Sequence, residues 1–208
     1  MLGKTHMAVG IASALAVTRP TTLAEIVLGV GIGGLGAVIS DIDVGTSESH
    51  RDADKIIAIA TITMIGIGVL DHFFHLGIWN RMKNNRAVYQ MVIAGLVFIG
   101  ICAYGKEKPH RSFMHSFLAM GMLSAVIAVI YPPAVIYFVV GFLSHLALDL
   151  FNYKKVRLFY PVKKGICFRM FHAHGMANDI AFITGVIVAA SEAAILVWQN
   201  LSETFHVF

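Results

Sequence analysis

The chain is built from long apolar runs separated by short polar segments. A helix needs about 20 residues to cross a hydrocarbon core of about 30 Å. The runs that come near this length are Thr22–Ser40, Lys55–Leu70, Ala87–Tyr104, Phe113–Tyr131, Pro133–Leu150 and Ile180–Trp198. The pattern therefore predicts an all-α, polytopic membrane helix bundle of about six or seven transmembrane helices, with residues 1–208 as a single membrane domain.

The opening run, His6–Val17, is shorter than the others, and it either crosses the bilayer fully or enters it as a half-helix. Arg19-Pro20 ends it, because proline cannot continue a helix and also restricts the residue before it. A secretory signal peptide is the alternative, since Lys4 gives a basic start and Ala14-Leu15-Ala16 resembles a cleavage site. The short apolar core and the span that follows almost at once favour a membrane segment.

Composition supports the membrane class. Hydrophobic residues make up 57% of the chain and charged residues only 13%, whereas an ordinary soluble domain has roughly 25% charged residues. This balance excludes disordered and fibrous proteins as well. The two cysteines form no disulfide framework.

Charge then orients the bundle. If the opening run crosses, residues 1–5, 41–54, 105–112 and 151–179 share one face of the membrane. With Lys55 at its border, twelve of the 16 Lys and Arg residues lie on this face, and the four on the other face are Arg19, Arg81, Lys83 and Arg86. The positive-inside rule predicts that the first face and the N-terminus are cytoplasmic and that the C-terminus is external. The basic loop 151–179 is interpreted as a lid, a lipid-headgroup surface or a simple topology signal.

Ionisable side chains gather at the predicted cytoplasmic ends of the runs. Such groups in or beside a membrane span are costly, so they are functional candidates. Ionisable residues placed at random would be divided evenly between the two faces. Asp71, His72 and His75 lie on the other face, and an interfacial helix end explains them. The cytoplasmic set is His6, Asp41, Asp43, His50, His110, His115, His145 and Asp149.

Two acidic motifs carry much of this signal. Asp41-Ile42-Asp43 follows a span, where it is either a site or a solvated helix end with an Asx-turn. His145 and Asp149 are four residues apart and share one helix face. This pair is interpreted as two metal ligands, as a histidine oriented by Asp149, or as a structural hydrogen bond.

The segment His110–Ser116 opens the run that begins at Phe113. Ser112 is the predicted N-cap, which would place His115 in the first helical turn. There the helix dipole would keep His115 neutral and able to bind metal, and with Arg111 it would attract a phosphate. An interfacial anchor is the alternative interpretation.

A glycine motif in the second run matches a nucleotide-binding pattern, but its position inside an apolar run favours close helix packing. Gly29-x-Gly31-x-x-Gly34 matches the dinucleotide fingerprint, yet no strand precedes it. Gly29 and Gly33 are therefore predicted to allow close helix packing. The chain has no G-x-S-x-G, H-E-x-x-H or P-loop motif.

The polar motifs occur in a characteristic order. They are Gly3-Lys4-Thr5-His6, Ser40-Asp41-Ile42-Asp43, His110-Arg111-x-x-x-His115-Ser116 and Gly141-x-x-Ser144-His145-x-x-x-Asp149. From residue 1 to about 180 this set resembles the bacterial YdjM-like family, whose members are described as LexA-regulated inner-membrane proteins of the metal-dependent hydrolase type. More remotely it is similar to zinc-dependent phospholipases C and P1 nucleases, which hold zinc with His and Asp.

The sequence departs from the family pattern in two places. Ser40 stands where the family often has proline, and the family often has a histidine soon after the second aspartate. Asn178-Asp179 stands where Asn-Glu is expected. The substitutions keep a carboxylate that can bind metal.

These features together predict a membrane-bound, metal-dependent hydrolase at the cytoplasmic face of the bacterial inner membrane. Zinc suits the mixed donors, with manganese or iron as alternatives. A metal-activated water would cleave a phosphate ester of a lipid or lipid-linked substrate, with Asp41 or Asp43 as general base and Arg111 stabilising charge. No nucleic-acid partner is expected. The predicted metal ligands are His6, Asp41, Asp43, His110, His115, His145 and Asp149.

Two other classes of protein remain as alternatives. A transporter would use the same His and Asp residues as an ion or proton path. A non-catalytic scaffold would use the basic loop to bind lipid or a partner. Metal content separates the hydrolase and the transporter from the scaffold, and turnover without ion flux separates the hydrolase from the transporter.

Overall fold

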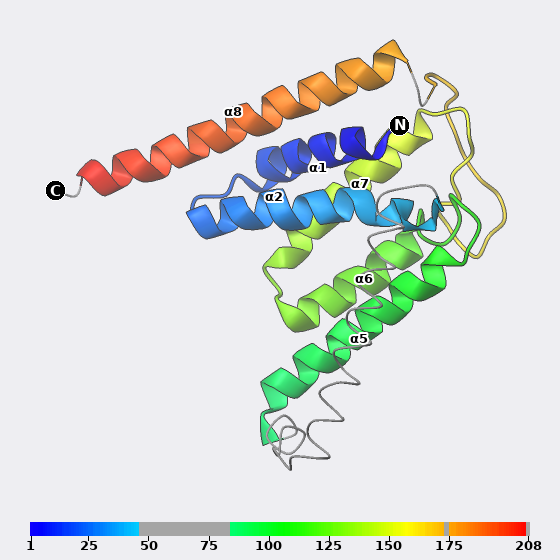
Figure 1. The fold of residues 1–208 in the computed structure, drawn as a ribbon, viewed down its shortest axis with the longest axis horizontal. Helices are drawn as coiled ribbons and strands as arrows, with labels where there is room; N and C mark the ends of the chain where they lie inside the picture. The colour runs from blue at the N-terminus through cyan, green and yellow to red at the C-terminus, as the bar shows by residue number, and fades with distance from the viewer. Residues whose placement is uncertain (46–83, 173–174, 207–208) are drawn as a thin grey trace.

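The computed structural model describes residues 1–45, 84–172 and 175–206, and these residues form helices and no strands (Figure 1). The predicted all-helical class is confirmed. The predicted span Lys55–Leu70, together with His50, Asp71, His72 and His75, lies outside the described residues. The helices are α1 (Gly3–Thr18), α2 (Leu23–Val38), the 3-10 helix η1 (Ile39–Asp43), α5 (Arg86–Lys106), α6 (Phe117–Ile130), α7 (Ala134–Leu150) and α8 (Met176–His206).

Local signals set most of these boundaries. Thr22 caps α2 in a capping box, in which its hydroxyl accepts from the Glu25 N–H at 3.2 Å and the Glu25 carboxylate accepts from the Thr22 N–H at 3.2 Å. Asn85 caps α5 by accepting from the Val88 N–H at 3.3 Å. These helices begin within a residue or two of the predicted runs.

The start of α6 differs from the prediction. Ser116, and not Ser112, is the N-cap, and its hydroxyl accepts from the Ala119 N–H at 3.2 Å. Ser112 instead donates its hydroxyl to the Pro109 carbonyl, and Arg111 adopts a left-handed φ of 63°. Residues 107–116 are therefore a loop, and His115 lies outside the helix.

Three helical segments are long and apolar enough to cross a membrane. They are Leu23–Asp43, Arg86–Lys106 and Met176–Gln199, with mean hydropathies of 1.9, 2.0 and 2.3. At 1.5 Å per residue, α1, α6 and α7 reach only about 21 to 26 Å, which is less than a typical hydrocarbon core. The described residues thus support a membrane helix bundle with three helices of full spanning length.

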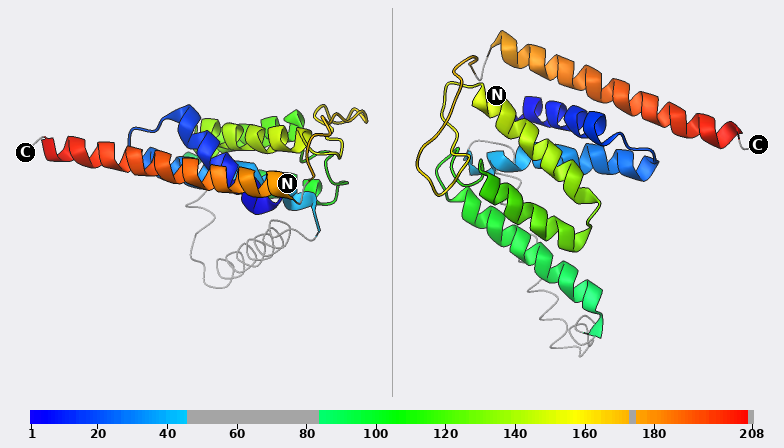
Figure 2. Two further views of the ribbon diagram at one scale, coloured as in Figure 1. Left: turned by 90° about the horizontal axis from the view of Figure 1, so that it is seen from above. Right: turned by 180° about the vertical axis from the view of Figure 1, so that it is seen from behind.

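The bundle is centred on α1, α2 and α7, which pack against one another. Helix α8 packs on α1 at one side, and α6 joins α7 to α5 at the other (Figures 1 and 2). Phe138, Phe142 and Leu123 are fully buried between α2, α6 and α7. The outer faces of α5 and α8 carry exposed apolar side chains, as expected for helices that face lipid.

Glycines allow the central helices to approach closely. A Cβ on Gly29 would meet the Leu15 side chain at 2.7 Å, and a Cβ on Gly33 would meet Ala14 at 2.5 Å. The predicted close packing through Gly29 and Gly33 is confirmed. On the other side of α2, a Cβ on Gly141 would overlap the Gly33 carbonyl.

We expect Gly141→Ala to destabilise the bundle by about 1–3 kcal/mol, because overpacking forces the backbones of α2 and α7 apart. Thermal unfolding of the purified protein in detergent measures this. Gly121→Ala in α6 is the control, since nothing lies within 4 Å of its Cβ position. Equal stability of the two variants would contradict the close packing of α2 and α7.

One end of the bundle collects the polar segments. The start of α1, the end of α2, the loop 107–116, the end of α7, the loop 151–172 and the start of α8 all lie there (Figure 1). These segments belong to the face that the sequence predicts to be cytoplasmic.

We expect reporter fusions at Asn84 and Lys108 to report opposite sides of the membrane, with Lys108 cytoplasmic. The reason is that α5 lies between these positions and has full spanning length. A fusion at Lys154 should report the same side as Lys108. If Asn84 and Lys108 report the same side, α5 does not cross the membrane.

Candidate metal centre

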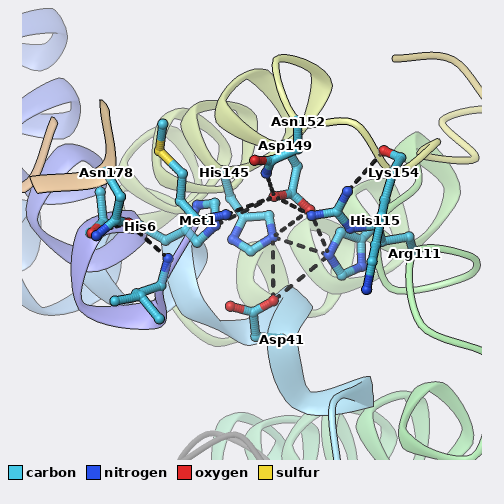
Figure 3. A network of polar contacts seen from close by, with 12 residues as sticks. Met1, His6, Asp41, Arg111, His115, His145, Asp149, Asn152, Lys154 and Asn178 are labelled. Carbon is cyan, nitrogen blue, oxygen red and sulfur yellow. Dashed lines mark hydrogen bonds and ion pairs between the residues drawn. The ribbon is translucent and has the colours of Figure 1, made fainter. Parts of the chain in front are cut away.

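Residues distant in sequence meet at the polar end of the bundle. The first turn of α1 supplies His6, η1 supplies Asp41 and Asp43, the loop 107–116 supplies His110 and His115, and the last turns of α7 supply His145 and Asp149. Figure 3 labels His6, Asp41, His115, His145 and Asp149 among these residues and shows their side chains converging. The structure therefore brings together all seven predicted ligands.

The side chains form three overlapping groups in which the ligand atoms lie within 4.8 Å of one another. His145 belongs to two groups, and so does His115. Each group combines imidazole nitrogen with carboxylate oxygen, which suits zinc, manganese or iron. The groups are His6, His145 and Asp149; Asp41, His115 and His145; and Asp43, His110 and His115.

A backbone carbonyl orients His145. Its Nδ1 lies 2.6 Å from the Ala37 carbonyl oxygen. Because a carbonyl only accepts, Nδ1 carries the proton and the Nε2 lone pair faces the cluster. Asp149 Oδ2 lies 4.0 Å from this Nε2. The Ala37 carbonyl thus orients His145, a role that the sequence offered as one alternative for Asp149, and both His145 and Asp149 remain candidate ligands.

Asp43 fixes the loop 107–116 against η1. Its Oδ1 lies 2.8 Å from His110 Nδ1, and its Oδ2 accepts from the Arg111 N–H at 3.2 Å. His115 Nδ1 lies 3.3 Å from the same Oδ2. The Asp43 carboxylate is fully buried. Asp41, in contrast, lines a cavity that opens beside the cluster and is described below, and Asp43 does not line it.

Asp149 is held by Arg111 from the opposite direction. Its Oδ1 accepts from Arg111 Nη2 at 3.0 Å and from Asn152 Nδ2 at 2.9 Å. Arg111 Nη1 also donates to the Lys154 carbonyl at 2.8 Å. A left-handed backbone costs a non-glycine residue about 1–2 kcal/mol, and these contacts hold Arg111 in that conformation.

The electrostatics of the cluster favour a cation. Asp41, Asp43 and Asp149 place three carboxylates in a mostly buried space, where negative charge is costly unless cationic groups or a metal ion lie beside it. Burial lowers the pKa of His115, but its contacts with Asp149 and Asp43 outweigh this and raise the pKa to about 9. His115 is therefore protonated when no metal is bound, and a metal would replace that proton. The predicted place of His115 in the first turn of a helix is wrong, because α6 begins after it.

A cavity of about 700 Å³ opens beside the cluster. Asp41, His110, Arg111 and Asp149 line it from one side, and Lys154 lines it from the loop 151–172. Guanidinium and ammonium groups in such a place suit an anion.

The N-terminus of α6 does not contribute to this cavity. Its Phe117 N–H donates to the Leu158 carbonyl at 2.9 Å, and its Ala119 N–H is bound by Ser116. The predicted helix-terminal phosphate site is therefore wrong, because the helix starts four residues later than expected and its end is already capped.

Asn178 is a contributor whose role the sequence did not reveal. Its buried Oδ1 accepts from the Leu2 N–H at 3.0 Å and from the Thr5 hydroxyl at 2.9 Å. This ties the start of α8 to the turn that carries His6. Asp179, its neighbour in the motif, is exposed and accepts from Asn178 Nδ2 at 3.3 Å.

We expect Asn178→Ala to weaken metal binding by about 10-fold or more, since residues that orient ligands typically contribute 10- to 100-fold. It should also lower stability by about 1–3 kcal/mol, because the Leu2 and Thr5 donors lose a buried acceptor. Metal titration and thermal unfolding measure the two effects. Asp179→Asn is the control. Unchanged metal affinity in Asn178→Ala would show that this contact does not position His6.

The fold and the cluster define an all-helical membrane protein that buries histidines and aspartates at one end of its bundle. The chain belongs to the YdjM inner membrane protein family, whose model matches residues 1–205. Membership in the family that the ordered motifs resemble is thereby confirmed. Comparisons with curated proteins and with solved structures gave no match.

Proposed function

We propose that the protein is a metal-dependent hydrolase that cleaves a phosphate ester of a lipid or lipid-linked substrate. The observation that carries the proposal is the overlap of three His and carboxylate groups beside a cavity lined by Arg111 and Lys154. A transporter would use the His and carboxylate groups as an ion path, but it has no need of Arg111 and Lys154, whose positive charges suit a phosphate. These two residues therefore favour the hydrolase.

The donor set fits a divalent cation. His6, His145 and Asp149 would hold one ion, and Asp41 and His115 extend the same cluster through His145. When bound, such an ion polarises a phosphoryl oxygen and lowers the pKa of water.

The chain's own residues supply the remaining functions. Asp41 lines the cavity and is proposed as the general base that takes a proton from the attacking water. Arg111 also lines the cavity, where its guanidinium is proposed to stabilise charge on the phosphoryl oxygens. Asp43 is proposed as a positioning residue, because its carboxylate is enclosed by His110, His115 and the Arg111 backbone.

The place of the cluster supports a lipid substrate. It lies at the end of apolar helices, so a polar head can enter the cavity while the tail stays in the bilayer. We propose that this end faces the cytoplasm of a bacterial cell, on the basis of the positive charges of its loops.

The test is to incubate the purified full chain with mixed membrane lipids, with and without a chelator, and to follow phosphate-bearing products by mass spectrometry. The proposal expects products that disappear with chelator and in Asp41→Asn. Absence of any chelator-sensitive product, together with metal-dependent ion flux in vesicles, would favour the transporter.

A further inference from the structure

An apolar groove continues from the polar cavity along the bundle. Its volume is about 620 Å³, and it lies between α1, α8 and the end of α7. Met1 and Phe171 line both the groove and the polar cavity, so the two spaces adjoin. A ligand can therefore occupy both at once.

Small side chains open this groove. Ala12 and Ala16 line it from α1, and Ala181 and Gly185 line it from α8. Both helices begin at the polar end and run side by side away from it (Figures 1 and 2). From Ala177 to Val188 the groove follows α8 for about 16 Å, at 1.5 Å per residue.

The surroundings of the groove are hydrophobic. Helix α8 is long enough to span the bilayer, and it exposes Ile180, which lines the groove, together with Ile183 and Ile187. The groove thus runs from a polar cavity lined by both acidic and basic side chains into the hydrocarbon depth of the membrane, which matches the order of head and tail in a lipid.

We propose that this groove holds one acyl chain of an anionic phospholipid whose phosphate-bearing head lies in the polar cavity. The part of this inference that concerns turnover rests on the proposed function. The part that concerns lipid binding rests only on the groove and the polar cavity that adjoins it. Arg111 and Lys154 at the polar end offer charges that complement an anionic head, and a metal ion held by the carboxylates that line the same cavity would add to them.

A second apolar groove offers a comparison within the same molecule. It has a volume of about 410 Å³ and lies between α5 and α6, where Ala94, Ala125 and Val129 line it. It shares no lining residue with the polar cavity. A ligand bound only for its tail would use both grooves, whereas a ligand held by head and tail would use only the groove between α1 and α8.

Cross-linking tests the binding. Phosphatidic acid with a diazirine in its tail is photolysed with the full chain in nanodiscs, and the labelled peptides are mapped by mass spectrometry. We expect label on α1 and α8 that falls in Ala16→Phe and Thr184→Phe, which fill the groove from exposed positions. Ala125→Phe, exposed in the other groove, should keep the label. Uniform labelling of all apolar faces, or a dimer that excludes the label, would overturn the proposal.

Chain length tests the consequence for turnover. We expect Ala16→Phe and Thr184→Phe to shift the preference between dioleoyl and dioctanoyl phosphatidic acid toward the shorter lipid by about 10-fold, the lower range for pocket discrimination. A general folding defect would lower both rates equally. Label in the groove without turnover would leave the groove proposal standing and contradict the proposed function. Turnover with an unchanged chain-length preference and no label in the groove would support the proposed function and overturn the groove proposal.

Discussion

Asp149→Asn is expected to remove the metal from the purified protein and to lower turnover by more than about 100-fold, the upper range for residues that only orient a ligand. Asp149 lies 3.4 Å from His115 Nε2 and 3.5 Å from His6 Nε2, so its oxygens face two histidines of the cluster. Asparagine keeps the shape but replaces a negative ligand with a neutral amide. Elemental analysis and the chelator-sensitive lipid assay measure the two losses.

Asp149→Asn also takes the charge partner from buried Arg111, and breaking a buried pair costs about 3–5 kcal/mol. His145→Ala therefore accompanies it, because this variant removes a ligand and leaves the Arg111 pair in place. Asp179→Asn, the same change at an exposed position of α8, should retain the metal and the activity. If both His145→Ala and Asp149→Asn keep the full metal content, the cluster is not the metal site.

Arg111→Lys is expected to lower turnover by about 100- to 1000-fold, as for the loss of one group that stabilises charge in a transition state. The guanidinium spans Asp149 and the Lys154 carbonyl with two nitrogens, at 3.0 and 2.8 Å, while it lines the cavity. A lysine ammonium is a point charge and does not reproduce this planar arrangement. Metal content should stay near that of the unmodified protein, because Arg111 is not a ligand.

Arg169→Lys is a closely matched control. Arg169 also has a left-handed backbone, with φ of 56°, but it is exposed in the loop 151–172 and does not line the cavity. Turnover in Arg169→Lys should stay unchanged. Equal activity of the two variants would remove Arg111 from the proposed mechanism, whereas loss of metal in Arg111→Lys would make it a support of the ligands.

The pattern of the sequence was sufficient to predict the helical class and most helix boundaries. Apolar runs of near-spanning length have few alternatives, because backbone polar groups in lipid must bond within a helix. Local caps such as Thr22 and Asn85 then set the starts of helices within a few residues. For the same reason the seven ligand candidates stood out, since ionisable side chains in an apolar chain are rare and costly.

The loop before α6 shows what local pattern did not decide. Ser112 and Ser116 are both good N-caps, and the choice between them depends on a contact with Asp43, which lies 68 residues before Arg111. Together with the side-chain contacts to Asp149 and the Lys154 carbonyl, that contact holds Arg111 in a left-handed conformation, and α6 begins only at Phe117. His115 therefore faces the carboxylates from a loop. Sequence spacing contains no information about such a distant partner.

The sequence by itself thus determined that this is a helical membrane protein with an ordered set of His and Asp residues, because hydrophobicity and charge are properties of each residue. Only the tertiary structure decided how these residues act together. The Ala37 carbonyl that orients His145, the amide of Asn178 beneath His6 and the groove that adjoins the cavity all arise where separate helices meet. A backbone carbonyl is common to every residue, so its role is defined by packing alone.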